Sequence, residues 1–388
     1  MHFAFLVPAA PGHTYPALPI AEELVRRGHR VSFATSERMA PVARASGVEP
    51  FVLPDEPPTA RLSGTEFTAD ELAAMLEGVL DHARTCFPGL EEHFRADTPD
   101  VVCFDSVDPT GRMLADKLSV PCAALVPNLA SDENRAFSET FVPESFDFRN
   151  PRLLRLFRDM REFAVEHGLE DVPDPMSGAM AERNIVLVPR EFQPNGTRFD
   201  ERFFFVGPSL GLRGKADEWR PADPGARLVY ISLGTAFNER PEFFRACLDA
   251  FRDGRWQVAM SVGDRVRPDE LGDIPPNVEV RSHFPQLSVL RRADAFITHA
   301  GMNSTMEALH LGVPTVAVPQ VAEQKTNALR LQELGLGRYL AGDPAADALR
   351  EAVDAVADDA DVRTNLDRMR EVIRGSGGAG AAADVLER

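Results

Sequence analysis

The sequence predicts an α/β protein made of two halves, each built around a parallel β-sheet. Three observations support this fold. The chain has 388 residues, which is long for a single hydrophobic core and comfortable for two. Short apolar runs alternate with segments of helical periodicity in two separate series. Between the series, residues 207–225 are rich in Gly, Pro and charge and lack periodicity, as in a linker.

The first series opens with an apolar strand at residues 3–7, a turn, and a helix at 18–27. A strand at 30–34 and a short helix at 39–45 continue the alternation. Later strands are predicted at 100–104, 122–126 and 184–188. Because strands and helices alternate, the strands should be parallel.

The second series restarts with a strand at residues 228–233. Further strands are predicted at 257–262, 278–280, 295–298 and 313–318, and two late helices at 346–357 and 362–374. We therefore expect an N-terminal domain over 1–206, a linker over 207–226, a C-terminal domain over 227–374, and a final helix over 375–388 that packs back on the N-terminal domain. Two such halves suggest Rossmann-like domains that face each other across a cleft.

Composition excludes several classes of partner. The formal net charge of −18 argues against nucleic acid or an anionic membrane, because phosphate contact requires a basic face. The four cysteines show no metal-binding spacing and are expected to be free thiols. No apolar run reaches membrane-spanning length and no positive leader precedes the first apolar run, so we expect a cytoplasmic protein.

The most informative pattern lies in residues 295–327, AFITHAGMNSTMEALHLGVPTVAVPQVAEQKTN. A strand is followed by His-Ala-Gly and by a helix whose first turn contains Asn-Ser-Thr. Free backbone N–H groups and the positive end of the helix dipole make such a turn an anion site. His299 adds an imidazole donor, and Glu307 is a carboxylate suited to a ribose hydroxyl pair. The alternative for the Gly turn, considered alone, is a turn needed only for tight packing. The alternative for His299, considered alone, is a structural histidine.

In the first half, His13 follows Gly12 in the turn after the first strand, and Asp105 ends the strand DVVCFD. Both lie at the carboxyl edge of the sheet, where ligands of α/β proteins bind. A carboxylate bonded to one imidazole nitrogen leaves the other nitrogen free to accept a proton. The alternatives are an exposed loop histidine and an Asp that caps the following helix.

The string H-A-G-M-N-S-T-M-E, then G-V-P and P-Q-x-x-E-Q, resembles the nucleotide-sugar motif of the UDP-glycosyltransferases, most closely the bacterial macrolide and natural-product branch. This resemblance implies the GT-B fold, with the acceptor on the N-terminal half and the nucleotide sugar on the C-terminal half. In G-H-T-Y-P and C-F-D-S, it implies that His13 is the catalytic base and Asp105 its partner. The implied reaction is an inverting O-glycosyl transfer without a metal or other cofactor.

The resemblance also implies a set of donor contacts around the phosphates, base, ribose and sugar. These residues are Ser232, Gly234, Thr235, His283, Phe284, Gln286, His299, Gly301, Asn303, Ser304, Glu307, Glu323 and Gln324. His283 stands where the family usually has a base-stacking Trp, which leaves uridine and thymidine both open. Glu323 stands where many glucose-using relatives have Asp. The first expectation is UDP-glucose, and the alternative is a TDP-deoxysugar.

We expect an apolar, hydroxyl-bearing acceptor such as a macrolide, another polyketide or a flavonoid. Its predicted contacts are Phe67, Phe87, Phe137 and Phe141, in the irregular segments that follow the strands. Rings that only pin a surface loop to the core are the alternative. A nucleotide-sugar epimerase and a non-catalytic helper are the competing functions. The chain is expected to be a monomer or homodimer.

Overall fold

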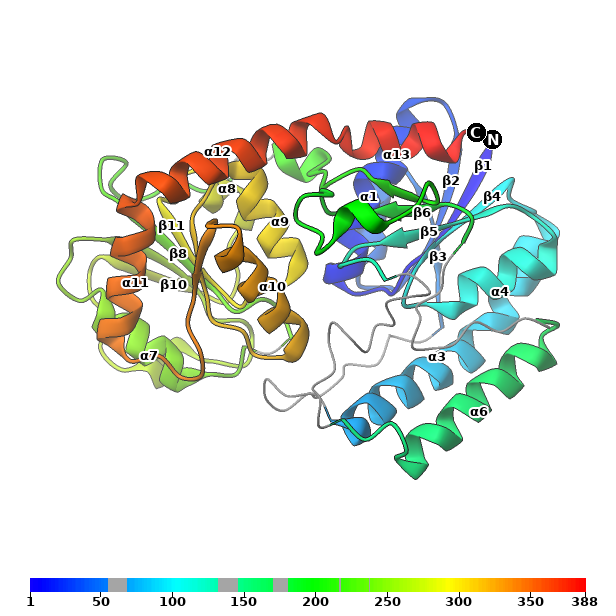
Figure 1. The fold of residues 1–388 in the computed structure, drawn as a ribbon, viewed down its shortest axis with the longest axis horizontal. Helices are drawn as coiled ribbons and strands as arrows, with labels where there is room; N and C mark the ends of the chain where they lie inside the picture. The colour runs from blue at the N-terminus through cyan, green and yellow to red at the C-terminus, as the bar shows by residue number, and fades with distance from the viewer. Residues whose placement is uncertain (55–67, 132–145, 170–180, 216–217, 237) are drawn as a thin grey trace. The chain divides into compact units, whose positions relative to one another are not determined.

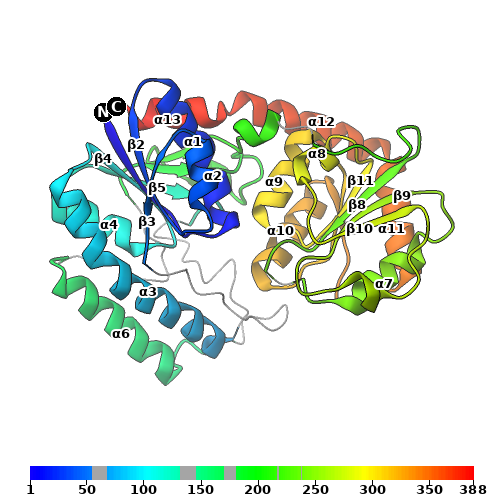
Figure 2. The same cartoon turned by 180° about the vertical axis from the view of Figure 1, so that it is seen from behind.

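A computed structural model describes residues 1–54, 68–131, 146–169, 181–215, 218–236 and 238–388. The chain forms two compact units, Met1–Leu212 with Ser376–Arg388 (unit 1) and Arg213–Gly375 (unit 2). Figures 1 and 2 show the elements of both units. The chain thus passes from unit 1 to unit 2 at residue 213, within the segment predicted as a linker, and returns after residue 375.

Unit 1 contains a seven-stranded parallel sheet with the strand order β3-β2-β1-β4-β5-β6-β7. The strands are β1 (His2–Leu6), β2 (Arg30–Thr35), β3 (Glu49–Val52), β4 (Val101–Asp105), β5 (Cys122–Val126), β6 (Asn184–Val186) and β7 (Phe203–Phe205). Both faces of β1 are buried, since Phe3 and Phe5 belong to one core cluster and Ala4 and Leu6 to another. This explains the continuous apolar run at the start of the sequence.

Helices cover both faces of this sheet. They are α1 (Pro11–Arg26), α2 (Ala40–Ala45), α3 (Ala69–Ala96), α4 (Pro109–Leu118), α6 (Pro151–Glu166) and α13 (Gly378–Leu386). Thr68 and Glu71 form a capping box that fixes the start of α3. Helices α3 and α6 lie side by side (Figures 1 and 2), and Arg152 donates to Glu77 between them at 2.8 Å.

Unit 2 contains a six-stranded parallel sheet with the strand order β10-β9-β8-β11-β12-β13. The strands are β8 (Leu228–Ser232), β9 (Gln257–Ser261), β10 (Val278–Arg281), β11 (Ala295–Thr298), β12 (Thr315–Ala317) and β13 (Gly337–Tyr339). The helices are α7 (Pro241–Ala250), α8 (Gln286–Leu290), α9 (Met302–Leu311), α10 (Ala322–Glu333), α11 (Ala346–Asp358) and α12 (Ala360–Gly375). Trp219, which the sequence placed in the linker, is buried here against Phe284 and Tyr230.

The two sheets share one topological feature. In unit 1 the chain builds β1, β2 and β3 outward and then returns to place β4 on the other side of β1. Unit 2 repeats this arrangement with β8, β9 and β10, followed by β11 on the other side of β8. Each sheet therefore has a switch point, between β1 and β4 and between β8 and β11. Ligands of open parallel sheets bind at the carboxyl ends of the strands at such points.

The end of the chain is part of unit 1. Helix α13 packs on α1, and its apolar residues Ala382, Ala383, Val385 and Leu386 join the core beside that helix. Arg27 donates to Asp384 at 2.7 Å, to Glu387 at 2.6 Å and to the carbonyl of Gly380 at 3.0 Å. None of the helices in the described parts of the chain is both long and apolar enough to cross a lipid bilayer.

Replacing Leu386 with Ala should destabilise unit 1 by about 2–5 kcal/mol, because truncation of a fully buried leucine leaves a cavity. Leu154→Ala on α6 is the matched control, since that side chain is 51% exposed, and it should change stability by less than about 0.5 kcal/mol. Urea unfolding monitored by circular dichroism measures both changes. Equal destabilisation by the two variants would contradict a structural role for α13.

Candidate active site

The switch point of unit 1 brings His13 and Asp105 together. His13 lies in the first turn of α1, directly after β1, and Asp105 is the last residue of β4. Strands β1 and β4 are paired, with Leu6 opposite Phe104, so both residues reach the same edge of the sheet. The Nδ1 atom of His13 lies 2.8 Å from Oδ2 of Asp105. The structure thus shows a hydrogen-bonded pair, and not the alternatives of an exposed loop histidine and an Asp that caps the next helix.

Asp105 is available to His13 because another residue caps the next helix. Asp108 is the N-cap of α4 and accepts from the backbone N–H of Thr110 at 2.9 Å. The second oxygen of Asp105 accepts from the backbone N–H of Val107 at 3.1 Å. The carboxylate is therefore held on both sides in a site where it is 1% exposed.

This geometry sets the proton position on His13. When Nδ1 carries the proton and donates it to Asp105, the basic lone pair is on Nε2. The side chain of His13 is 26% exposed, so the imidazole lies at the surface of unit 1 while its partner is enclosed. A buried carboxylate also stabilises the imidazolium that forms when Nε2 accepts a proton.

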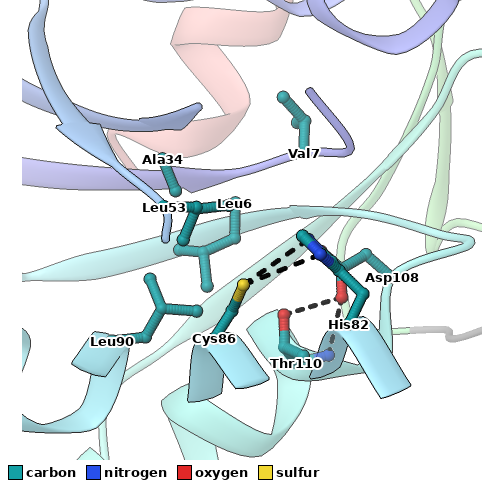
Figure 3. A pocket seen from close by; sticks show the side chains of 9 residues that line it. All are labelled: Leu6, Val7, Ala34, Leu53, His82, Cys86, Leu90, Asp108 and Thr110. Atoms are coloured by element: carbon teal, nitrogen blue, oxygen red, sulfur yellow. Dashed lines mark hydrogen bonds between the residues drawn. The ribbon is translucent and has the colours of Figure 1, made fainter. Parts of the chain in front are cut away.

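A pocket opens at the same carboxyl edge of the sheet (Figure 3). Its walls combine apolar side chains from the sheet and α3 with a polar side formed by α3 and the start of α4. The lining residues are Leu6, Val7, Ala34, Leu53, His82, Cys86, Leu90, Asp108 and Thr110. Burial raises the pKa of the Asp108 carboxyl above its usual range.

The predicted acceptor contacts are not assembled at this pocket. Phe87 is fully buried on α3, where its ring packs against Phe163 and His167. Its ring therefore packs in the core and presents no surface to an acceptor. Phe67, Phe137 and Phe141 lie outside the described residues.

The switch point of unit 2 brings the loop after β8 against the loop after β11. Gly234 has a φ of +77°, and a Cβ atom at this position would lie 2.6 Å from the ring of His299. A Cβ atom on Gly301 would also collide with this ring. Both glycines are thus needed for the close approach that encloses the imidazole.

The turn between His299 and Gly301 has an unusual backbone. Ala300 has a φ of +60°, in the left-handed region that disfavours residues with a Cβ. The buried side chain of Asn327 donates to the carbonyl of Ala300 at 3.0 Å and so supports this conformation. Gly301 is the N-cap of α9 and provides no side-chain acceptor, which leaves the first N–H groups of the helix available for an anion.

His299 is neutral at physiological pH. Burial lowers its pKa to about 4. Its Nδ1 atom is buried without a hydrogen-bond partner among the described residues. An uncharged imidazole has a single N–H, so a hydrogen bond to an anion would replace its bond with the backbone of Ser232, and the helix dipole supplies the positive potential.

A second group of predicted donor residues is connected by hydrogen bonds along α9. Gln286 at the start of α8 donates to the hydroxyl of Ser304 at 3.1 Å and to Oε2 of Glu307 at 2.7 Å. Arg213 donates to Oε1 of Glu307 at 3.1 Å. The sequence did not predict a role for Arg213, because this contact joins positions 94 residues apart and no motif marks it.

The remaining predicted donor residues have different surroundings. Thr235 and His283 are exposed, and His283 lies 2.9 Å from a carboxylate oxygen of Asp264. Phe284 packs in the core of unit 2. The side chain of Gln324 is buried and accepts from the backbone N–H of Gln320 at 2.8 Å. Asn303 and Glu323 are partly exposed.

The described residues contain no group of three or more His, Cys, Asp or Glu side chains placed to hold a metal ion. The sequence Asp359 to Asp361 lies between α11 and α12, where Asp359 accepts from the backbone N–H of Asp361 at 2.8 Å. Asp359 thus acts as a local cap for α12.

Known proteins resemble the chain over its whole length. The sequence model of the family described as "Erythromycin biosynthesis protein CIII-like, C-terminal domain" matches residues 247–376. The NDP-glycosyltransferase YjiC of Bacillus subtilis (strain 168) is 37% identical over 100% of this chain and 96% of its own length. The demethyllactenocin mycarosyltransferase of Streptomyces fradiae is 38% identical over 100% of this chain and 86% of its own length.

A solved structure agrees with these matches. The calicheamicin glycosyltransferase CalG4 superposes with a TM-score of 0.84 at 34% identity, over 100% of this chain and 97% of its own. The glycosyltransferase of kitacinnamycin gives a TM-score of 0.88 at 31% identity, over 100% of this chain and 98% of its own. The predicted family and the GT-B fold are confirmed, and the chain belongs to the bacterial natural-product branch of the UDP-glycosyltransferases.

Proposed function

We propose that this enzyme transfers a sugar from a nucleoside diphosphate donor to a hydroxyl group of an apolar natural product, with inversion and without a metal ion. The hydrogen bond between His13 and Asp105, at 2.8 Å, is the observation that carries this proposal. Relatives named as an oleandomycin glycosyltransferase and a demethyllactenocin mycarosyltransferase support the natural-product acceptor. A macrolide, another polyketide or a flavonoid fits an apolar acceptor of this kind.

In the proposed reaction, Nε2 of His13 removes the proton from the acceptor hydroxyl as its oxygen attacks the anomeric carbon. The bond from the anomeric carbon to the diphosphate oxygen breaks on the opposite face, and the configuration inverts. Asp105 stabilises the imidazolium formed at His13, because its charge lies 2.8 Å from Nδ1. General-base catalysis of this kind contributes about 10²- to 10⁴-fold to a rate.

The reaction also requires that the negative charge on the departing diphosphate be stabilised. We assign its stabilisation to the N-terminus of α9, where the first N–H groups have no side-chain cap, and to a hydrogen bond from His299. The hydroxyl of Ser232, close to the backbone of Gly234, adds a further donor. Glu307 would accept from a hydroxyl of the sugar that carries the base. These groups stabilise developing negative charge with dipoles, so the proposed step needs no metal ion.

The proposed donor is a uridine or a thymidine diphosphate sugar. Uridine and thymidine diphosphate sugars are both tested by a donor panel offered with mixed polyketide and flavonoid acceptors. A mass shift equal to one sugar identifies transfer, the proton coupling at the anomeric carbon reports inversion, and activity retained in EDTA supports the metal-free step. An epimerised sugar formed without an acceptor would instead favour an epimerase. With four free thiols, we place the reaction in the cytoplasm.

His13→Ala should lower kcat/KM by about 10²- to 10⁴-fold, because it removes the base. Asp105→Asn should also lower kcat/KM, since the amide cannot stabilise the imidazolium. Steady-state kinetics with the acceptor found in the panel measures both effects. Asp116→Asn on the exposed face of α4 is the matched control and should keep wild-type kinetics. Full activity of His13→Ala would remove His13 from the mechanism.

His299→Ala should weaken diphosphate binding by the same factor at pH 6 and pH 8. Since the pKa of His299 is lowered to about 4, the imidazole accepts a proton only below this range and is neutral at both pH values. Loss of one hydrogen bond to an anion should cost about 10-fold or more in Kd. Isothermal titration of UDP and TDP into wild type and variant at each pH measures the ratio of the two Kd values. Because both proteins meet the same nucleotide at a given pH, protonation of the nucleotide does not change this ratio.

The matched control for this measurement is His310→Ala, at the opposite end of α9, which should leave the affinity unchanged. A loss clearly larger at pH 6 than at pH 8 would show that His299 acts as an imidazolium. That outcome would contradict the assignment of a neutral donor.

A further inference from the structure

Both oxygens of the Glu307 carboxylate are engaged by other side chains of unit 2. Oε1 accepts from Nη1 of Arg213 at 3.1 Å, and Oε2 accepts from Nε2 of Gln286 at 2.7 Å. The side chain of Glu307 is 3% exposed, whereas that of Arg213 is 33% exposed. The carboxylate is therefore buried, and the guanidinium of Arg213 lies beside one of its oxygens.

This arrangement matters for a ligand that binds Glu307 through hydroxyl groups. A ribose has neighbouring 2′ and 3′ hydroxyls, and a carboxylate binds such a pair by accepting one bond at each oxygen. At Oε1 a hydroxyl must compete with a charge-assisted bond from Arg213, which is stronger than a neutral one. At Oε2 the competing donor is the uncharged amide of Gln286, so a hydroxyl competes there with a neutral bond only.

Gln286 is itself held in place. Its Oε1 atom lies 3.5 Å from the hydroxyl of Tyr230, a side chain that is almost fully buried. Its amide nitrogen also donates to Ser304 at 3.1 Å. The Oε2 side of Glu307 is thus preorganised to accept one sugar hydroxyl, while the Oε1 side is already paired with a cation.

We propose that Arg213 is a specificity-determining residue that makes this donor site favour 2′-deoxynucleotides. The donor class is then a thymidine diphosphate sugar in preference to a uridine diphosphate sugar. A ribose 2′-hydroxyl at this site must compete with the charge-assisted bond from Arg213 for Oε1, and this competition disfavours binding. A 2′-deoxyribose presents one hydroxyl, which can bond to Oε2 without disturbing the guanidinium. The inference rests on the proposed function, in which Glu307 contacts the sugar of the nucleotide.

The test compares UDP with 2′-deoxyuridine diphosphate, which differ only in the 2′-hydroxyl, by isothermal titration into the full chain. Wild type should bind the deoxynucleotide about tenfold more tightly. Arg213→Met should remove this preference by strengthening UDP binding, because Oε1 becomes available. Arg213→Lys keeps a cation beside Oε1 and should retain the preference for the deoxynucleotide.

Arg227→Met is the matched control, since Arg227 precedes the first residue of β8 and donates to Asp358 at 2.9 Å. Its nucleotide preference should equal that of wild type. Thermal unfolding of each variant establishes that it folds. Tighter binding of UDP than of 2′-deoxyuridine diphosphate by wild type would overturn the inference. So would an Arg213→Met variant whose ratio of the two Kd values equals that of wild type. Binding of neither nucleotide would instead overturn the proposed function itself.

Discussion

The order of strands in the two parallel sheets is the constraint on which both candidate sites depend. At a switch point the chain leaves neighbouring strands in opposite directions, so no connection crosses the carboxyl edge there. His13 and Asp105 come from β1 and β4, the two strands beside the switch in unit 1. Gly234 and His299 follow β8 and β11, the corresponding strands in unit 2. The proposed general base and the proposed anion site thus lie at equivalent places in two separate sheets.

In each unit one titratable group of the candidate site is buried. Asp105 is enclosed and held by two hydrogen bonds, which fixes its charge beside an imidazole that remains at the surface of unit 1. In unit 2 the imidazole is the enclosed partner, since glycines at 234 and 301 let the backbone approach its ring. In the proposed mechanism the same residue type therefore serves as a base in one unit and as a neutral donor in the other, because burial lowers the pKa of His299.

The sequence predicted the alternation of strands and helices, the family and the pair at His13, because these depend on local periodicity and on a motif. It placed the first helix at residue 18, whereas α1 begins at Pro11 and contains Pro16 and Pro19. Pro16 and Pro19 lie beyond the first turn of α1, where a proline removes a helical hydrogen bond and usually ends a helix, so the pattern around them gave the wrong boundary. Trp219 and Arg213 were missed because their partners are distant in sequence and their segment has the composition of a linker.

Screening of exposed charges explains how an acidic chain can bind an anionic donor. The net charge of −18 is spread over the molecule, and at physiological ionic strength exposed charges are screened beyond about 8 Å. In the proposed function, binding of a diphosphate is then decided by groups within contact distance, namely the start of α9 and an uncharged imidazole. Glu307 is the negative charge on that helix, and Arg213 pairs with it. In the proposed donor site this pairing reduces repulsion of the phosphates and also limits what the carboxylate accepts from a sugar.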